Sequence, residues 1–328
     1  MTQRIETLTT PTAGRVVRSK WARRWLTFLM VLGPGLIVMV ADNDAGAVST
    51  YTQAGATYGV KLLWLLIFLL PVTYFVQEMV ARLGIATGQG HAAMIYKRFG
   101  KWWGAFSLFD LELLNFLTMV TEFAAINLAA SMLGISPYLA VPLTAVGLIV
   151  MVATASYRRW ERVSIILCVL DLAWLAYALF LGPSVSTVAR ACVLPGMPPH
   201  GITSDYIFLV IAIVGTTIAP WQLFFQQSCI ADKRLRFSDL KWERIDTFIG
   251  ACIVILMAAC MMLVGDAARR YGLQHAGFTY TDPAQMARFL GQAFGPLVRN
   301  GVLLLMINAS LLKKDLLTGL HLGVGRIA

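Results

Sequence analysis

Charged residues are scarce in this sequence, and that scarcity excludes an ordinary soluble domain. Asp, Glu, Lys and Arg make up 13% of the 328 residues and hydrophobic residues make up 58%, whereas an average soluble domain is about 25% charged. The mean hydropathy is +0.70, and the apolar residues form blocks of about twenty, enough to cross a hydrocarbon core of roughly 30 Å. The net charge of +10 comes from basic residues between these blocks. We therefore expect a lipid bilayer, and not nucleic acid, as the partner.

Several motifs are also absent. The five cysteines form no CxxC or other metal-ligand spacing, so we interpret them as small apolar side chains. The polar, basic stretch before residue 25 lacks the apolar core of a signal peptide. No nucleotide-binding or hydrolytic motif occurs, so we expect neither an enzyme nor a resident cofactor. No feature indicates a protein partner.

Eight apolar blocks are candidate membrane spans. They lie at Trp25–Tyr58, Leu62–Leu83, Gly104–Leu133, Pro137–Ala155, Val163–Leu181, Tyr206–Ile230, Ile245–Val264 and Phe289–Leu312. Basic residues gather before the first block and in the even-numbered loops, and the positive-inside rule then places the N-terminus in the cytoplasm. We expect residues 1–24 to be a basic cytoplasmic tail and residues 25–312 to be the transmembrane domain of a multi-pass protein of the plasma (inner) membrane.

The first predicted span carries polar side chains where lipid should be. Asp42, Asn43 and Asp44 lie between two apolar runs and are followed by Gly46, and each ionisable group at that depth costs at least about 2 kcal/mol. Unwound backbone is tolerated there only where it lines a cavity or packs against protein. Carboxylate and freed carbonyl oxygens suit a hard cation. We predict a broken helix with a cation site at Asp44; a kinked helix whose acids pair with a buried base is the alternative.

The sixth predicted span contains a second candidate break. Pro220 has no backbone N–H and frees the carbonyl of Thr216 one turn earlier. Gln222 and Gln226 follow on one helical face. An ordinary proline kink would explain this span alone. However, the first and sixth spans occupy matching positions in two halves, residues 25–181 and 206–312, and broken helices at matching positions are what an inverted repeat predicts.

Other acids also lie in predicted spans, among them Glu122, Asp171 and Glu78. Glu122 in the third span is deep enough to reach a central site. Asp171 in the fifth span is equally well explained by an interhelical hydrogen bond. Glu78 lies four residues before Arg82 at the end of the second span, so we expect a structural ion pair.

Three strings now resemble one family. Gly33-Pro34-Gly35, Asp44-Ala45-Gly46-Ala47 and Ala219-Pro220-Trp221 are similar to motifs of the Nramp metal transporters, over Gly33 to about Leu312. The resemblance implies an all-α integral membrane protein with the LeuT-type inverted-repeat fold, in which two halves of about five helices each are inverted and helices 1 and 6 are broken. About eight transmembrane helices are expected here, with the second repeat incomplete.

The departures from the family pattern concern the metal ligands. Typical members read D-P-G-N in the first span, where Asp and Asn bind metal; here Asp44 remains and Ala47 replaces the asparagine. Typical members read M-P-H in the sixth span, where the methionine binds metal; here Ala219 and Trp221 take the outer positions. A carbonyl ligand three residues before that methionine maps to Thr216.

This pattern resembles the magnesium-transporting branch of the family. Loss of a thioether removes a ligand that favours softer ions, and Mg²⁺ usually retains several waters, which suits a site widened by two alanines. The resemblance implies transport of Mg²⁺ and also Mn²⁺, with Asp44 as ligand and Gln222 or Glu122 holding water. Glu122 remains from an acidic pair on the family's proton route, whereas Met119 replaces the aspartate. We therefore expect uniport-like transport without obligatory proton coupling.

The end of the sequence departs from the pattern as well. Lys313-Lys314-Asp315 follows Leu312 directly, and we expect this charged cluster to interrupt the eighth span. Residues 313–328 then form an atypical tail, explained by a frameshift or truncation or, alternatively, by a natural short variant. Two other functions stay open: a proton- or sodium-coupled solute symporter of the same fold, which would need free half-helix N-termini for a carboxylate substrate, and a non-transporting fragment.

Overall fold

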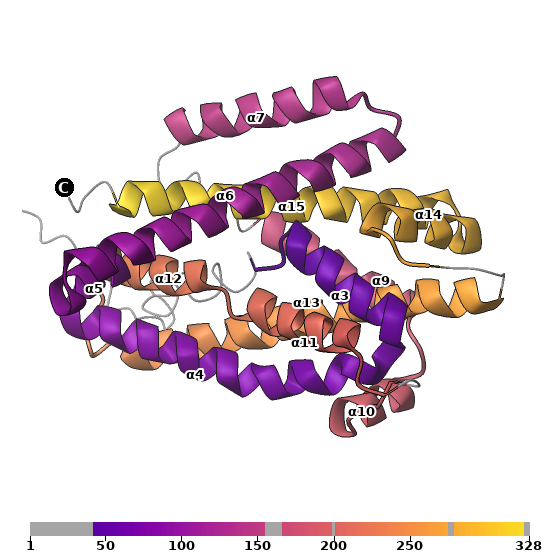
Figure 1. Cartoon of the computed structure of the whole chain (residues 1–328), viewed down its shortest axis with the longest axis horizontal. Coiled ribbons are helices and arrows are strands. Elements are labelled where there is room, and N and C mark those ends of the chain that lie inside the picture. The colour runs from indigo at the N-terminus through magenta and orange to yellow at the C-terminus, as the bar shows by residue number, and fades with distance from the viewer. Residues whose placement is uncertain (1–41, 155–165, 199–200, 275–278, 325–328) are drawn as a thin grey trace, which may run out of the picture.

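A computed structural model describes residues 42–154, 166–198, 201–274 and 279–324, which are helical with short connections and contain no strand. The elements are α3 (Ala45–Tyr58), the 3-10 helix η1 (Gly59–Leu62), α4 (Leu63–Thr87), α5 (His91–Phe99), α6 (Lys101–Met132), α7 (Pro137–Thr154), α9 (Ala173–Leu181), α10 (Val185–Val193), α11 (Ser204–Thr217), α12 (Pro220–Lys233), α13 (Leu240–Gln274), α14 (Pro283–Phe294) and α15 (Pro296–Val324) (Figure 1).

The predicted membrane spans correspond to these helices with shifted bounds. Among the described residues, 4 stretches can cross a membrane by length and composition: Ala45–Thr87, Lys101–Met132, Ser204–Lys233 and Leu240–Gly272. A fifth candidate is Ile166–Leu181 with Val185–Val193, a pair bent by 111°, and two shorter apolar helices cover Pro137–Val150 and Pro296–Leu311. The half of the first span before the break, the basic tail and the Gly33-Pro34-Gly35 string lie outside the described residues.

The centre of the bundle is the contact between α3 and α13. Both helices carry a glycine at the crossing: a Cβ on Gly55 would overlap the carbonyl oxygen of Met262, and a Cβ on Gly265 would overlap that of Thr52. Small residues let helix backbones approach closely in a membrane, where van der Waals packing drives helix association. This contact therefore fixes α3, the helix that follows Asp44, against the longest helix of the bundle.

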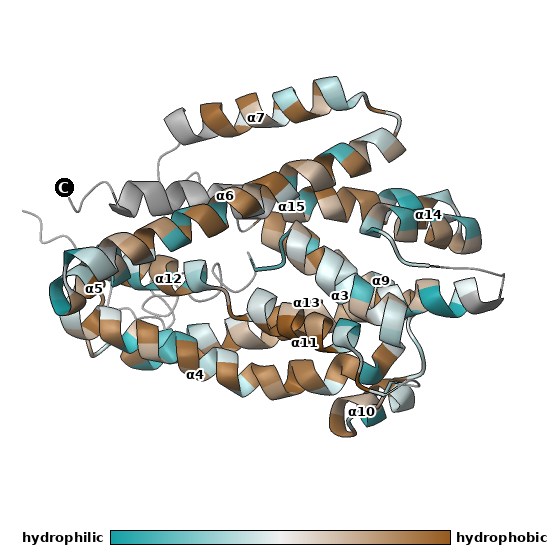
Figure 2. Ribbon diagram, viewed as in Figure 1, coloured by the Kyte–Doolittle hydropathy of each residue, from teal (hydrophilic) through white to brown (hydrophobic). Residues whose placement is uncertain are grey.

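The outer surface is apolar, unlike that of a soluble protein. Large apolar side chains are exposed on the outer faces of α4, α6, α7 and α9, among them Phe75, Phe109 and Phe180, and Figure 2 shows the long helices rich in hydrophobic residues. Carboxylates and amides such as Glu122 and Gln222 are fully buried. Apolar outer faces, with carboxylates and amides kept inside beside the apolar core, fit a protein solvated by lipid.

Two features of the second half differ from the prediction. The stretch Phe289–Leu312 is not one helix: α14 ends at Phe294 and α15 starts at Pro296, because Gly295 has a φ of 97°. The charged cluster at residues 313–315 does not interrupt α15, which continues to Val324, so that expectation was wrong. Lys and Leu are good helix formers. The charged residues 313–315 therefore end the apolar run of α15 but do not end the helix.

The predicted ion pair at the end of the second span is present. Arg82 Nη2 lies 3.1 Å from Glu78 Oε2, and Arg244 Nε of α13 lies 2.8 Å from Glu78 Oε1. Glu78 therefore joins α4 to the start of α13. The chain segments at this end, after α4 and between α12 and α13, carry further basic residues, so this end of the bundle is basic: Lys97, Arg98, Lys233, Arg234 and Arg236.

Candidate cation site at two helix breaks

Asp44 is the N-cap of α3. Its backbone is extended, and its carboxylate Oδ1 accepts a hydrogen bond from the Ala47 backbone N–H at 2.7 Å. An N-cap carboxylate satisfies a free N–H of the first turn and is favoured by the helix dipole. The side chain is 4% exposed, so a carboxylate is held inside the bundle at the point where the helix begins. A carboxylate has several lone pairs, so the same side chain can cap a helix and also bind a cation.

Glu122 of α6 brings a second carboxylate to the same helix end. The backbone N–H of Ala45 donates to both Glu122 oxygens at 3.3 Å, and the Glu122 side chain has no exposed surface. Two buried carboxylates therefore cover the first N–H groups of α3. The helix dipole compensates only part of this charge, since it is equivalent to about half a positive charge at the N-terminus. The arrangement favours a bound cation.

The second break lies where the sequence predicts it. α11 ends at Thr217 and α12 begins at Pro220. The N–H of Ile218 is bonded to the carbonyl of Val214, whereas Thr216 has lost its helical partner because Pro220 lacks an N–H. Ala219 is buried at the gap. The end of α11 thus offers carbonyl oxygen, at the negative end of its dipole.

A hydrogen bond joins the two broken helices. The Tyr51 hydroxyl of α3 and the Thr217 hydroxyl of α11 lie 2.8 Å apart, and both side chains are fully buried. The Asp42 and Asp44 carboxylates interact electrostatically with Tyr51. Asp42 and Asp44 at the start of α3 therefore lie near Tyr51, which in turn contacts the end of α11.

The remaining predicted residues have defined places. Ala47 contributes its backbone N–H to Asp44, and its methyl group packs in the main apolar core. Gln222 is fully buried, and its Oε1 accepts a hydrogen bond from Gln77 Nε2 of α4 at 2.9 Å. Asn43 is also fully buried, and neither atom of its amide has a hydrogen-bond partner among the described residues.

Asp171 makes the interhelical hydrogen bond that the sequence left open. Asn308 Nδ2 of α15 donates to Asp171 Oδ1 at 3.2 Å and to the Leu167 carbonyl at 3.0 Å. Asp171 therefore fixes the fifth span to α15.

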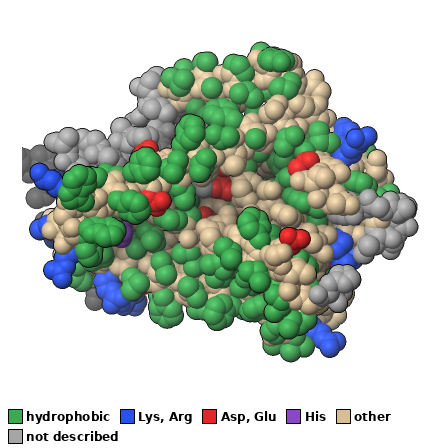
Figure 3. Space-filling view, in the orientation of Figure 1, with side chains coloured by type: hydrophobic (Ala, Val, Ile, Leu, Met, Phe, Trp, Pro, Cys, Tyr) green, Lys and Arg blue, Asp and Glu red, His purple; other side chains and the backbone are tan. Residues whose placement is uncertain are grey.

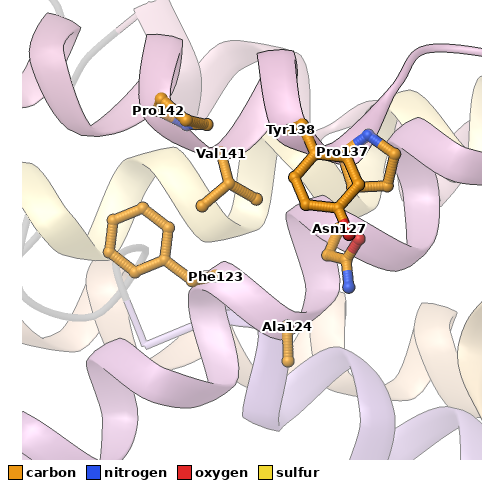
Figure 4. Close-up of a pocket in the computed structure, with 7 residues that line it drawn as sticks. All are labelled: Phe123, Ala124, Asn127, Pro137, Tyr138, Val141 and Pro142. Atoms are coloured by element: carbon orange, nitrogen blue, oxygen red, sulfur yellow. The ribbon is translucent and has the colours of Figure 1, made fainter.

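Among the cavities that the described residues line, two lie beside α6. One, of about 340 Å³, runs along the first turns of α3 and is bounded by Gly46, Ser49, Thr121 and Asp282. Figure 3 shows a hollow in the middle of one face, with acidic side chains in it. The other, of about 600 Å³, lies between α6 and α7, and most of its lining is apolar, with Asn127 as an exception (Figure 4). Of the two, the first offers oxygen ligands beside the break.

The connection before α14, which belongs to the second half of the chain, contacts α3 through Tyr280. The Tyr280 hydroxyl, in the connection before α14, donates to the Ser49 carbonyl at 3.1 Å and lies 3.0 Å from the Thr52 hydroxyl. Burial raises the pKa of Tyr280 to about 12, so the hydroxyl remains a donor at neutral pH.

The sequence predicted the start of α3 after Asp44 and the break between α11 and α12, but not the residues that connect them. Tyr51 and Thr217 gave no signal, because an aromatic residue and a threonine are ordinary in an apolar span. Gln77 could have been found as an amide inside the second span. Glu122 was expected to reach the site through water, and its direct bond to the Ala45 N–H was not foreseen.

Comparison with known proteins places this geometry in a family. Residues 35–312 match the family described as Nramp, natural resistance-associated macrophage protein-like. A crystal structure of the Eremococcus coleocola manganese transporter in complex with an aromatic bis-isothiourea substituted compound is similar with a TM-score of 0.71 and 21% identity, over 93% of this chain and 65% of that chain. A histidine-to-alanine variant of that transporter gives a TM-score of 0.69 and 22% identity, over 90% and 63%. This chain thus spans less than two thirds of the structures it matches.

Proposed function

This chain belongs to the Nramp family and is an integral membrane protein with its LeuT-type fold, and from that premise we propose that it transports divalent metal cations across a membrane. The observation that carries the proposal is the pair of buried carboxylates, Asp44 and Glu122, on the first N–H groups of α3. A divalent cation is the ligand whose charge matches two carboxylates. The carbonyl of Thr216 supplies neutral oxygen from the second break.

We propose Mg²⁺ as the cargo, with Mn²⁺ also accepted. Asp44 is the direct ligand. Ala47 and Ala219 offer no donor side chain, which leaves room for water on the ion, and Gln222 or Glu122 holds that water. Hard oxygen ligands and retained water suit Mg²⁺. A site without thioether has little discrimination in favour of softer ions.

We further propose uniport-like transport without obligatory proton coupling. Trp221 and Met119 occupy positions where proton carriers of the family would lie. With the N-terminus in the cytoplasm and the protein in the plasma (inner) membrane, the membrane potential drives inward flux. Two positive charges moving across 100 mV gain roughly 4.6 kcal/mol.

The symporter alternative is disfavoured by how the half-helix N-terminus is used. A carboxylate substrate would need free N–H groups at the start of α3, but the Ala45 and Ala47 N–H groups already bind Glu122 and Asp44. At the second break α12 begins with Pro220, which lacks an N–H. Both features favour a cation over an anion.

Substituting Asp44 tests the site. In proteoliposomes containing the full chain, Asp44→Ala is expected to abolish Mg²⁺ and Mn²⁺ influx, measured with metal-sensitive dyes inside the vesicles. Asp110→Asn, which neutralises an exposed acid of α6, is the matched control and should retain influx. Influx by Asp44→Ala equal to that of the unsubstituted chain would refute the site, and acidification of the lumen in proportion to Mg²⁺ influx would refute uncoupled transport.

A further inference from the structure

A second group of buried oxygens lies between α12 and α13. Gln226 Nε2 donates to Glu243 Oε1 at 3.3 Å and to Thr247 Oγ1 at 3.1 Å. All three side chains have no exposed surface, and Asp246 beside them on α13 is 1% exposed. A carboxylate, an amide and a hydroxyl are thus held together inside the bundle, away from the Asp44 break.

Two oxygens of this group have no partner. Glu243 Oε2 and Gln226 Oε1 are buried without a hydrogen bond among the described residues. Leaving a buried acceptor unsatisfied destabilises a fold, and native structures avoid it unless water, an ion or function explains it. Both free acceptors belong to side chains that already contact each other, so one hydrogen-bonded pair carries two buried oxygens without a partner.

The group is connected to the first site along one face of α12. Gln222, next to the break, and Gln226 are four residues apart and therefore share that face. Gln222 is bonded to Gln77 of α4. From Ala219 to Gln226 the helix rises about 10 Å. Buried polar side chains thus follow one another from the break toward the start of α13.

We propose that Glu243, Gln226 and Thr247 form a second station for the divalent cation, on the route between the Asp44 site and the basic end of the bundle. This inference rests on the proposed function and adds a site to it. The ligand class is a hard divalent cation, because the donors are all oxygens and include one carboxylate with a free oxygen. Under the proposed orientation this is the cytoplasmic side, and the station receives the ion as it leaves Asp44.

The surrounding cations do not occupy the station. Arg244 of α13 is bonded to Glu78 at 2.8 Å, and Arg82 binds the other oxygen of the same carboxylate. Lys233, in the last turn of α12, interacts electrostatically with Glu243, but no ion pair joins the two in the part of the chain that the structure describes. Glu243 therefore keeps an oxygen that can bind a metal ion.

Equilibrium dialysis with radioactive Mn²⁺ on the purified full chain in nanodiscs tests the station. The unsubstituted chain is expected to bind two ions, Asp44→Ala one, Glu243→Gln one, and the double variant none. Asp110→Asn is the control and should bind two. Excess Mg²⁺ should displace both ions.

The outcomes separate the two proposals. If Glu243→Gln binds as many ions as the unsubstituted chain, the second station is refuted, whatever Asp44→Ala does. If Asp44→Ala leaves the number unchanged while Glu243→Gln lowers it, the first site fails and the station stands. If Glu243→Gln misfolds and binds neither ion, Thr247→Val is the deciding variant. A fall of at least threefold in Mn²⁺ affinity at one of the two sites supports the station. Unchanged Mn²⁺ affinity at both sites overturns it.

Discussion

The two helix breaks differ in what they present to the space between them. α3 begins with N–H groups that are covered by carboxylates, whereas α11 ends with carbonyls and α12 begins with a proline that donates nothing. One break therefore supplies negative charge and the other supplies neutral oxygen. A divalent ion needs both, because charge alone would attract any cation and dipoles alone would not offset the loss of water. The difference teaches that matching breaks in two halves need not carry matching chemistry.

The largest effect is expected from removing the charge of Glu122, which α6 adds at the start of α3. Glu122→Ala leaves the Ala45 N–H buried without a partner, which is expected to destabilise the fold by about 1–3 kcal/mol, and it should also abolish Mn²⁺ binding at the Asp44 site. Glu122→Gln keeps an acceptor for the N–H and removes only the charge. It should retain thermal stability and weaken that site at least tenfold, as measured by thermal unfolding and Mn²⁺ dialysis. If Glu122→Gln binds Mn²⁺ as tightly as the unsubstituted chain, the charge of Glu122 does not contribute to metal binding.

A smaller effect is expected from giving the second break the donor that it lacks. Pro220→Ala restores an N–H that can bond to the Thr216 carbonyl and continue α11 into α12. We expect Mn²⁺ affinity of the Asp44 site to fall about tenfold, or about 1.4 kcal/mol, while the helix content measured by circular dichroism does not decrease. Pro142→Ala, in the interior of α7, is the matched control. The carbonyl has no role in binding if both variants keep full affinity.

The smallest effect concerns the hydrogen bond that joins the breaks. Tyr51→Phe and Thr217→Val each remove one partner of the 2.8 Å contact, and a typical hydrogen bond contributes about 0.5–1.5 kcal/mol. A double-mutant cycle on the free energy of unfolding should therefore give a coupling in that range. A coupling near zero would mean that the two half-helices are held together by their apolar contacts alone.

The start of α3 after Asp44 and the break between α11 and α12 could be predicted because their causes are local. A carboxylate in an apolar run and a proline inside a helix act on the residues next to them, so Asp44 and Pro220 mark the starts of α3 and α12 from sequence alone. The helix end at Phe294 was missed because Gly295 interrupts a run whose apolar character continues on both sides. The continuation of α15 past residue 312 was missed because hydropathy was used to judge a property that depends on helix propensity.

The site itself was only partly predictable, because its contacts join distant parts of the chain. The Ala45 N–H and Glu122 are 77 residues apart, and Gln77 and Gln222 are 145 apart. No spacing rule brings such pairs together before the packing of the helices is known. The role of Glu243 was hidden for the same reason, since its partner Gln226 lies on another helix.

The crossing of α3 and α13 has a consequence for how variation in this chain would be interpreted. Neither Gly55 nor Gly265 has room for even a methyl group, so a saturation mutagenesis screen should reject every substitution at these two positions as firmly as it rejects changes at Asp44. If positions were ranked by how poorly they tolerate substitution, these two glycines, which have no side chain to bind a metal, would rank beside the proposed ligands. Separating them requires a second assay, since loss of abundance in the membrane identifies the glycines and loss of flux at normal abundance identifies the ligands.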